Sequence, residues 1–169
     1  MFKLDSKKPV LTVSEKVYAV LPLSPPATNW STIDWYWKKI CGIPFLMRNI
    51  INIQRAGIDS LIIYGNTDNT SLYRRLCKEK KITIKLTFET DVEKVVKVTK
   101  DYPVLILNSE ALHTKQEIES GMSFTNQSNE ALAYPIDRET VAETINQITL
   151  ENKVSPAQSS GDQNSRVNF

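Results

Sequence analysis

Two short apolar runs constrain the fold of this chain most strongly. Residues 61–64 (LIIY) and 104–107 (VLIL) are continuous runs of large apolar side chains. Such runs are typical of strands that lie in a parallel sheet and are covered by helices on both faces. Apolar and polar residues instead alternate along residues 82–88. This alternation predicts a strand that is buried on one face only and lies at an edge of the sheet.

Helical patterns separate these strands. Residues 44–57 begin with Pro44 and end with Gly57, as expected for the first helical position and the C-terminal cap of a helix. Residues 70–80 form a second pattern, and Thr90 with Glu93 predicts a capping box for a third. The alternation of strands and helices predicts an α/β fold, a three-layer sandwich with a mostly parallel central sheet and right-handed crossovers.

The two ends of the chain are less regular. Residues 16–21 predict a first strand that Pro22 closes, and residues 30–40 predict a short helix with Ser31 as its N-cap. Residues 131–136 predict a short last strand, and a helix carrying Val141, Ile145 and Ile148 follows Asp137.

We therefore expect three parts in the 169 residues. Residues 1–15 are an irregular N-terminal segment, residues 16–153 are one α/β domain, and residues 154–169 are a disordered tail. The tail is expected to be disordered because it is polar and has few large apolar side chains.

Composition excludes several classes of function. The net charge is +2, which does not indicate a nucleic acid or an anionic membrane as a partner. Cys41 and Cys77 are the only cysteines, and no apolar run approaches the roughly 20 residues of a membrane-spanning helix. We expect a soluble, cytoplasmic protein. None of the five glycines lies within three residues of another, which excludes the glycine-rich motifs that cradle phosphates.

Candidate site residues follow the predicted strands, because ligands of such sheets bind beyond the carboxyl ends of the strands. All three tryptophans lie within residues 30–37, here called the tryptophan segment. Trp30 and Trp35 can stack on a base or sugar, and Lys38 or Lys39 can neutralise a phosphate. Alternatively, the rings pack this segment onto the sheet or form a surface for a protein partner. Glu110 follows the strand at 104–107 and can hold a divalent cation such as Mg²⁺.

Residues 42–50 (GIPFLMRNI), 54–59 (QRAGID) and 61–63 (LII) resemble the nucleotidyltransferase superfamily of the GT-A/Rossmann-like fold. The similarity covers residues 16–150 and is greatest to sugar-phosphate nucleotidyltransferases and inositol-1-phosphate cytidylyltransferase-like domains. It implies transfer of a nucleotidyl group from a nucleoside triphosphate to a sugar or polyol phosphate. It also implies that Lys38 or Lys39 is the basic catalytic residue and that Glu110 stands at the position of the magnesium ligand.

The chain departs from this family at two positions. The glycine-rich nucleotide loop is replaced by residues 22–26 (PLSPP), and prolines lack the amide donors that such a loop aims at phosphate. The family's metal-binding Asp is replaced by Glu110. We therefore predict a nucleotidyltransferase-like domain whose activity is weak or lost, a pseudoenzyme candidate. The alternative is a non-catalytic protein-interaction or regulatory module that retains the fold.

Overall fold

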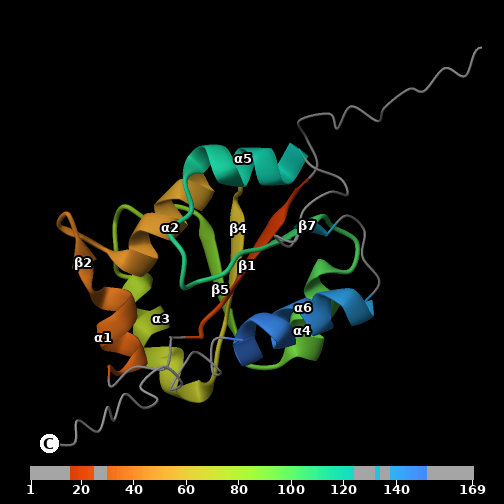
Figure 1. Ribbon diagram of the computed structural model, residues 1–169, viewed down its shortest axis with the longest axis horizontal. Coiled ribbons are helices and arrows are strands. Elements are labelled where there is room, and N and C mark those ends of the chain that lie inside the picture. Colours follow the sequence, from red (N-terminus) through yellow and green to blue (C-terminus); the bar gives the residue numbers. More distant parts are fainter. Residues whose placement is uncertain (1–15, 25–29, 124–131, 134–137, 152–169) are drawn as a thin grey trace, which may run out of the picture.

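A computed structural model describes residues 16–24, 30–123, 132–133 and 138–151. A five-stranded sheet with the strand order β5-β4-β1-β6-β7 lies between two layers of helices (Figure 1). A separate ribbon pairs β2 with β3. The predicted α/β class with a mostly parallel central sheet is confirmed. The irregular segment 1–15 and the tail 154–169 lie outside the described residues.

Four strands of the sheet are parallel: β1 (Tyr18–Pro22), β4 (Ser60–Tyr64), β5 (Lys85–Glu89) and β6 (Val104–Ile106). The fifth, β7 (Leu132–Ala133), pairs with β6 in the antiparallel direction. Tyr18 is in register with Ser60 on one side and with Val104 on the other, so β1 occupies the centre. The two continuous apolar runs lie inside the sheet and the alternating run lies at its edge, as predicted.

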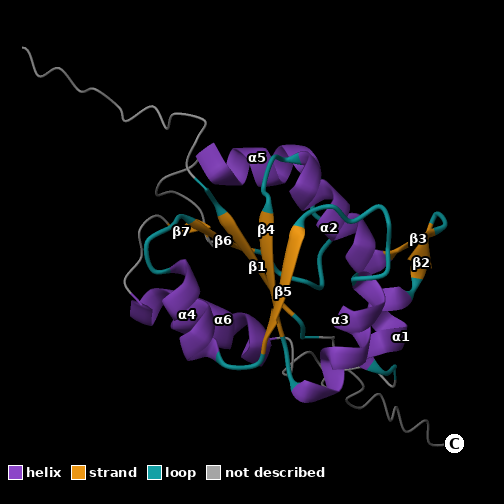
Figure 2. Cartoon of the chain, turned by 180° about the vertical axis from the view of Figure 1, so that it is seen from behind, coloured by secondary structure: helices purple, strands orange, loops and turns teal. Residues whose placement is uncertain are grey.

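Both faces of the sheet are covered. Four helices pack on one face: α1 (Thr32–Trp37), α2 (Phe45–Arg55), α3 (Thr70–Leu76) and α5 (Lys115–Ser123). The other face carries α4 (Val92–Thr99) and α6 (Arg138–Glu151), which Figure 2 shows on the side opposite to α1, α2 and α3. Leu61 and Ile63 belong to the first apolar cluster, and Ile62 belongs to the second. This double burial explains the continuous apolar runs.

The predicted helix over residues 30–40 is wrong at its C-terminal end. Helix α1 begins after the N-cap Ser31, as predicted, but it ends at Trp37. The chain then forms a ribbon from β2 (Lys39–Ile40) and β3 (Ile43–Pro44). Cys41 and Gly42 connect these strands with φ values of 48° and 80°, which a two-residue hairpin turn requires and a helix excludes.

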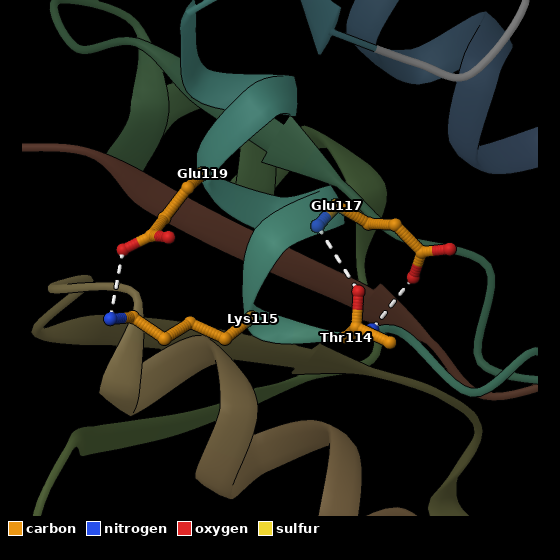
Figure 3. Close-up of polar contacts among 4 residues, drawn as sticks. All are labelled: Thr114, Lys115, Glu117 and Glu119. Carbon is orange, nitrogen blue, oxygen red and sulfur yellow. Dashed lines mark hydrogen bonds and ion pairs between the residues drawn. The ribbon is translucent and has the colours of Figure 1, made fainter.

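The starts of two further helices differ from the interpretation of the sequence. The N-cap of α4 is Asp91, whose carboxylate accepts a hydrogen bond from the amide of Glu93 at 3.0 Å, so the predicted Thr90 and Glu93 capping box is wrong. Helix α5 was not predicted from the polar sequence beyond residue 107. Its start is a true capping box, because the amide of Glu117 donates to Thr114 Oγ1 at 3.2 Å and the amide of Thr114 donates to Glu117 Oε2 at 2.7 Å (Figure 3).

Among the described residues, no helix is long and apolar enough to cross a membrane.

Candidate functional site

The strand order identifies where a ligand would be expected. Strands β4 and β6 lie on opposite sides of β1, so the chain builds one half of the sheet and then crosses to the other. A crevice forms outside the carboxyl ends of strands at such a switch point and is the usual ligand site of parallel sheets. Here the crevice is bordered by Pro22 and Ser24 after β1 and by Ser109 after β6.

Tyr36 of α1 fills this crevice with a chain of hydrogen bonds, here called the Tyr36 network. The amide of Ser24 donates to Tyr36 Oη at 3.0 Å, and Tyr36 Oη lies 2.7 Å from Ser109 Oγ. Ser109 Oγ donates to the carbonyl oxygen of Pro22. Because a serine hydroxyl has a single proton, Tyr36 must be the donor to Ser109. Every bond of the chain therefore runs in one direction, from Ser24 to Pro22.

The Tyr36 network is closed to solvent. Ser24, Tyr36 and Ser109 are all buried, and burial raises the pKa of the Tyr36 hydroxyl well above its ordinary value, so it stays protonated at physiological pH. The amide of Ser24 follows β1 directly and would be a natural donor to a phosphate. It already has an acceptor inside the protein.

Glu110 lies directly beyond this network. Its Oε1 atom is buried and has no hydrogen-bond partner among the described residues, and burial raises the pKa of its carboxyl. The described part of the chain holds no group of three or more His, Cys, Asp and Glu side chains that could bind a metal ion.

Two asparagines of α2 hold the loop that carries Glu110. Asn49 is fully buried, donates to the carbonyl of Ala111 at 2.8 Å and accepts from the amide of His113 at 2.9 Å. Asn52 donates to the carbonyl of His113 at 2.8 Å. Backbone groups that would otherwise lack partners are thereby satisfied. Neither Asn49 nor Tyr36 was a predicted site residue, because the hydrogen-bond partners that give them their roles lie 62–73 residues further along the chain.

A second feature lies between α1 and α3, which are neighbours in both views (Figures 1 and 2). It is an open pocket of about 430 Å³, here called the tryptophan pocket, and its lining residues are Trp30, Asp34, Trp37, Lys38 and Arg75. Lys38 Nζ lies 4.6 Å from the centre of the Trp30 ring, and the Arg75 guanidinium lies 4.1 Å from the centre of the Trp37 ring. Both distances are within cation–π range.

The five predicted site residues are found at different places. Trp30 and Lys38 line the tryptophan pocket together. Trp35 packs against the core, with its ring 6.2 Å from that of Phe45. Lys39 is exposed on β2. Glu110 lies beside the Tyr36 network, so the structure does not unite it with the two residues that line the tryptophan pocket.

No protein-family model and no curated protein matches the chain. Among solved structures, the chain is similar to the crystal structure of 4-diphosphocytidyl-2C-methyl-D-erythritolsynthase from Anaerococcus prevotii. The TM-score is 0.46 and the sequence identity is 12%; the match covers 64% of this chain and 50% of that chain. The likeness is distant and concerns the arrangement of strands and helices alone. This chain thus matches about half the length of that enzyme.

Proposed function

We propose that the chain is a nucleotidyltransferase-like domain whose transferase activity is weak or lost and that acts as a non-catalytic binding module. One observation carries this proposal: the Tyr36 network occupies the crevice between β1 and β6. A transferase of this fold needs free amide donors there for the phosphates of its nucleotide. The amide of Ser24 donates to Tyr36 instead.

The positions of the charged residues also support the proposal. Catalysis of nucleotidyl transfer depends on placing cationic groups and a metal around one set of phosphates. Lys38 lies over Trp30 in the tryptophan pocket, whereas Glu110 lies beyond the Tyr36 network. If activity is retained, Lys38 or Lys39 neutralises charge on the transferred group, and Glu110 holds part of the coordination of Mg²⁺. Any Mg²⁺-dependent nucleotide binding that the domain keeps then passes through Glu110.

A pyrophosphate-release assay tests the loss of activity. The protein is incubated with Mg²⁺, with CTP, UTP, GTP or ATP, and with several sugar and polyol phosphates. We expect release at or close to the background without protein. Robust turnover with any pair of substrates would overturn the proposal.

Calorimetry tests the role of Glu110. We expect any Mg²⁺-dependent nucleotide affinity to fall about tenfold or more in Glu110→Gln, because a charged ligand is lost. The matched control is Glu117→Gln, which removes an exposed carboxylate from the first turn of α5 and should leave the affinity unchanged. Equal affinity in wild type and Glu110→Gln would show that Glu110 does not carry the metal.

The cysteines fit the proposed place of action. Cys41 and Cys77 are both exposed and free, and exposed thiols persist in reducing compartments. We propose that the domain acts in the cytoplasm.

A protein partner that binds the tryptophan segment is the second candidate for the binding function of the domain. Trp30 is half exposed at the start of that segment, which favours a binding role for it.

A further inference from the structure

We propose that the tryptophan pocket is a Mg²⁺-independent binding site for a small aromatic phosphate, a molecule that carries a planar ring and a phosphate group. The inference rests on the proposed function in so far as it treats the domain as a binding module, and it specifies the ligand. The ring of the ligand stacks in the aromatic part of the pocket, and its phosphate binds Lys38 and Arg75.

The aromatic part of the pocket comes from Trp30 and Trp37. Trp30 is 49% exposed, which is the largest exposure among the large hydrophobic residues described. An indole ring that is half exposed beside a hollow offers a flat apolar surface for a ring of the ligand. Trp37 also lines the pocket and packs against the core, and the Arg75 guanidinium lies over its ring.

Among the described residues, neither cation of the pocket forms an ion pair with a carboxylate. The one ion pair among the described residues joins Lys115 and Glu119 at 3.2 Å (Figure 3), so Lys38 and Arg75 have no carboxylate within ion-pair distance there. Asp34 also lines the pocket, but its carboxylate accepts a hydrogen bond from Ser31 Oγ at 2.6 Å. The pocket therefore has two positive charges against one negative charge.

Arg75 is suited to bind both parts of such a ligand. A guanidinium over an aromatic ring stacks through its flat face and keeps N–H groups at its edge for oxygen atoms of a phosphate. Lys38 adds a compact point charge beside it. Because both cations already lie over indole rings, their positions are partly fixed before the ligand binds, which lowers the entropy lost on binding.

The size of the pocket favours a small molecule. Its volume of about 430 Å³ lies in the range of roughly 300–1,000 Å³ that is usual for small-molecule sites. A mononucleotide and an aryl phosphate share the chemistry of ring plus phosphate, and either can be the source of the ligand. An acidic protein segment would satisfy the two cations but supplies no ring for the aromatic part, so it is the less favoured occupant.

Quenching of tryptophan fluorescence, measured in EDTA, tests the ligand class. The probes are AMP, UMP and 1-naphthyl phosphate, together with adenosine, ribose 5-phosphate and inorganic phosphate as partial ligands. We expect at least one aromatic phosphate to bind about tenfold or more tightly than every partial ligand, because only it engages both the ring surface and the cations. Binding of 1-naphthyl phosphate would show that ring and phosphate suffice, whereas binding of the nucleotides alone would assign a nucleotide source.

Paired variants locate the site. Arg75→Gln and Lys38→Gln should each weaken binding about tenfold or more, the loss expected for a charge-assisted hydrogen bond. Their controls are Arg74→Gln and Lys94→Gln, which remove the same charge from exposed residues that do not line the pocket and should leave affinity unchanged. Circular dichroism confirms that each variant is folded.

Three outcomes would overturn the inference: no aromatic phosphate binds, the control variants lose as much affinity as Arg75→Gln and Lys38→Gln, or an acidic peptide binds in place of the aromatic phosphates. The inference and the proposed function can fail separately. Robust pyrophosphate release with Arg75-dependent binding intact would overturn the loss of catalysis and leave the pocket assigned. Background release without any binding in EDTA would overturn the pocket alone.

Discussion

Two regions on either side of helix α1 differ in how their polar groups are paired. On its inner side, the Tyr36 network connects every donor to an acceptor within the protein, from the amide of Ser24 to the carbonyl of Pro22. On its outer side, Lys38 and Arg75 lie over indole rings and have no carboxylate partner among the described residues. The space beyond the carboxyl ends of β1 and β6 is therefore closed by buried residues, whereas the indole rings and the cations of the tryptophan pocket lie on the outer side of the same helix.

This difference depends on which residues of the short helix α1 face the core and which face solvent. Ser31 caps α1 by accepting a hydrogen bond from the amide of Asp34 at 3.1 Å, which sets where the helix begins. Tyr36 then faces the core and is fully buried. Asp34 and Lys38 lie two residues to either side of it, roughly 200° away around the helix axis, and both are exposed. The cap thus determines which side chains close the crevice and which line the pocket.

The largest expected loss of stability is in the closed region, which comprises the Tyr36 network and the adjoining loop after β6. Asn49→Ala removes a fully buried amide that bonds both Ala111 and His113. The carbonyl and the amide that lose their partner should each cost roughly 1–3 kcal/mol of stability. Urea denaturation should show this loss, with the m-value unchanged. Asn52→Ala is the control, since it removes one bond at a partly exposed position and should cost less. An equal loss in both variants would show that Asn49 stabilises the loop after β6 no more than Asn52 does.

Tyr36→Phe tests the Tyr36 network directly. The variant leaves the ring in place but removes the donor to Ser109 and the nearer acceptor of the Ser24 amide, which keeps only the longer bond of 3.4 Å to Ser109 Oγ. A loss of about 1–3 kcal/mol is expected, which thermal melting should record as a decrease of several degrees. Tyr73→Phe is the matched control, because the Tyr73 hydroxyl is partly buried at the sheet edge, where it donates a long hydrogen bond of 3.3 Å to the carbonyl of Leu86. If Tyr36→Phe melts like the wild type, the crevice is not closed by this network.

Substitutions in the open region, the tryptophan pocket, should lower the stability of the protein much less. Arg75→Gln removes a cation that lies over Trp37 at an exposed position, and such a contact stabilises by about 0.5–1 kcal/mol. Thermal melting should therefore show a small decrease, with Arg74→Gln unchanged. A loss as large as that of Tyr36→Phe would mean that Arg75 is a structural residue, and the contrast between the two regions would disappear.

The sequence predicted the architecture better than the site. Continuous apolar runs indicate burial on both faces of a sheet and alternation indicates burial on one, and both patterns depend on the local sequence. The interior strands β4 and β6 and the edge position of β5 were therefore predicted correctly, although β5 begins at Lys85 and not at residue 82. The Tyr36 network depends on contacts between residues 24, 36 and 109, which are far apart in the chain. Trp30 and Trp35 show the same limit: both were candidates for stacking on a base or sugar, but tertiary packing places Trp35 against Phe45 and leaves Trp30 half exposed. Helix α5 did have a local signal, the Thr114 and Glu117 capping box.

The smallest expected effect concerns Glu110, at the border of the closed region. Burial raises the pKa of its carboxyl above the ordinary value of 4.5, so the folded protein binds this proton more readily than the unfolded chain. The ionised carboxylate therefore lowers stability at neutral pH, and the penalty disappears as the pH falls through the raised pKa. Glu110→Gln should be slightly more stable than the wild type at pH 7, by less than about 0.5 kcal/mol because solvent screens this site.

Glu117→Gln should show the opposite sign, which makes it the sharper control. Hydrogen bonds from Thr114 lower the pKa of the Glu117 carboxyl, so its ionised form stabilises the fold above pH 4.5, and this contribution is lost as the pH falls through the lowered pKa. The variant should be less stable than the wild type at pH 7, and the two should converge in acid. Melting curves of both variants between pH 7 and pH 3 separate the two cases. A destabilised Glu110→Gln at pH 7 would mean that the Glu110 carboxylate has a cationic partner in solution, and Mg²⁺ titration of the wild type would then identify it.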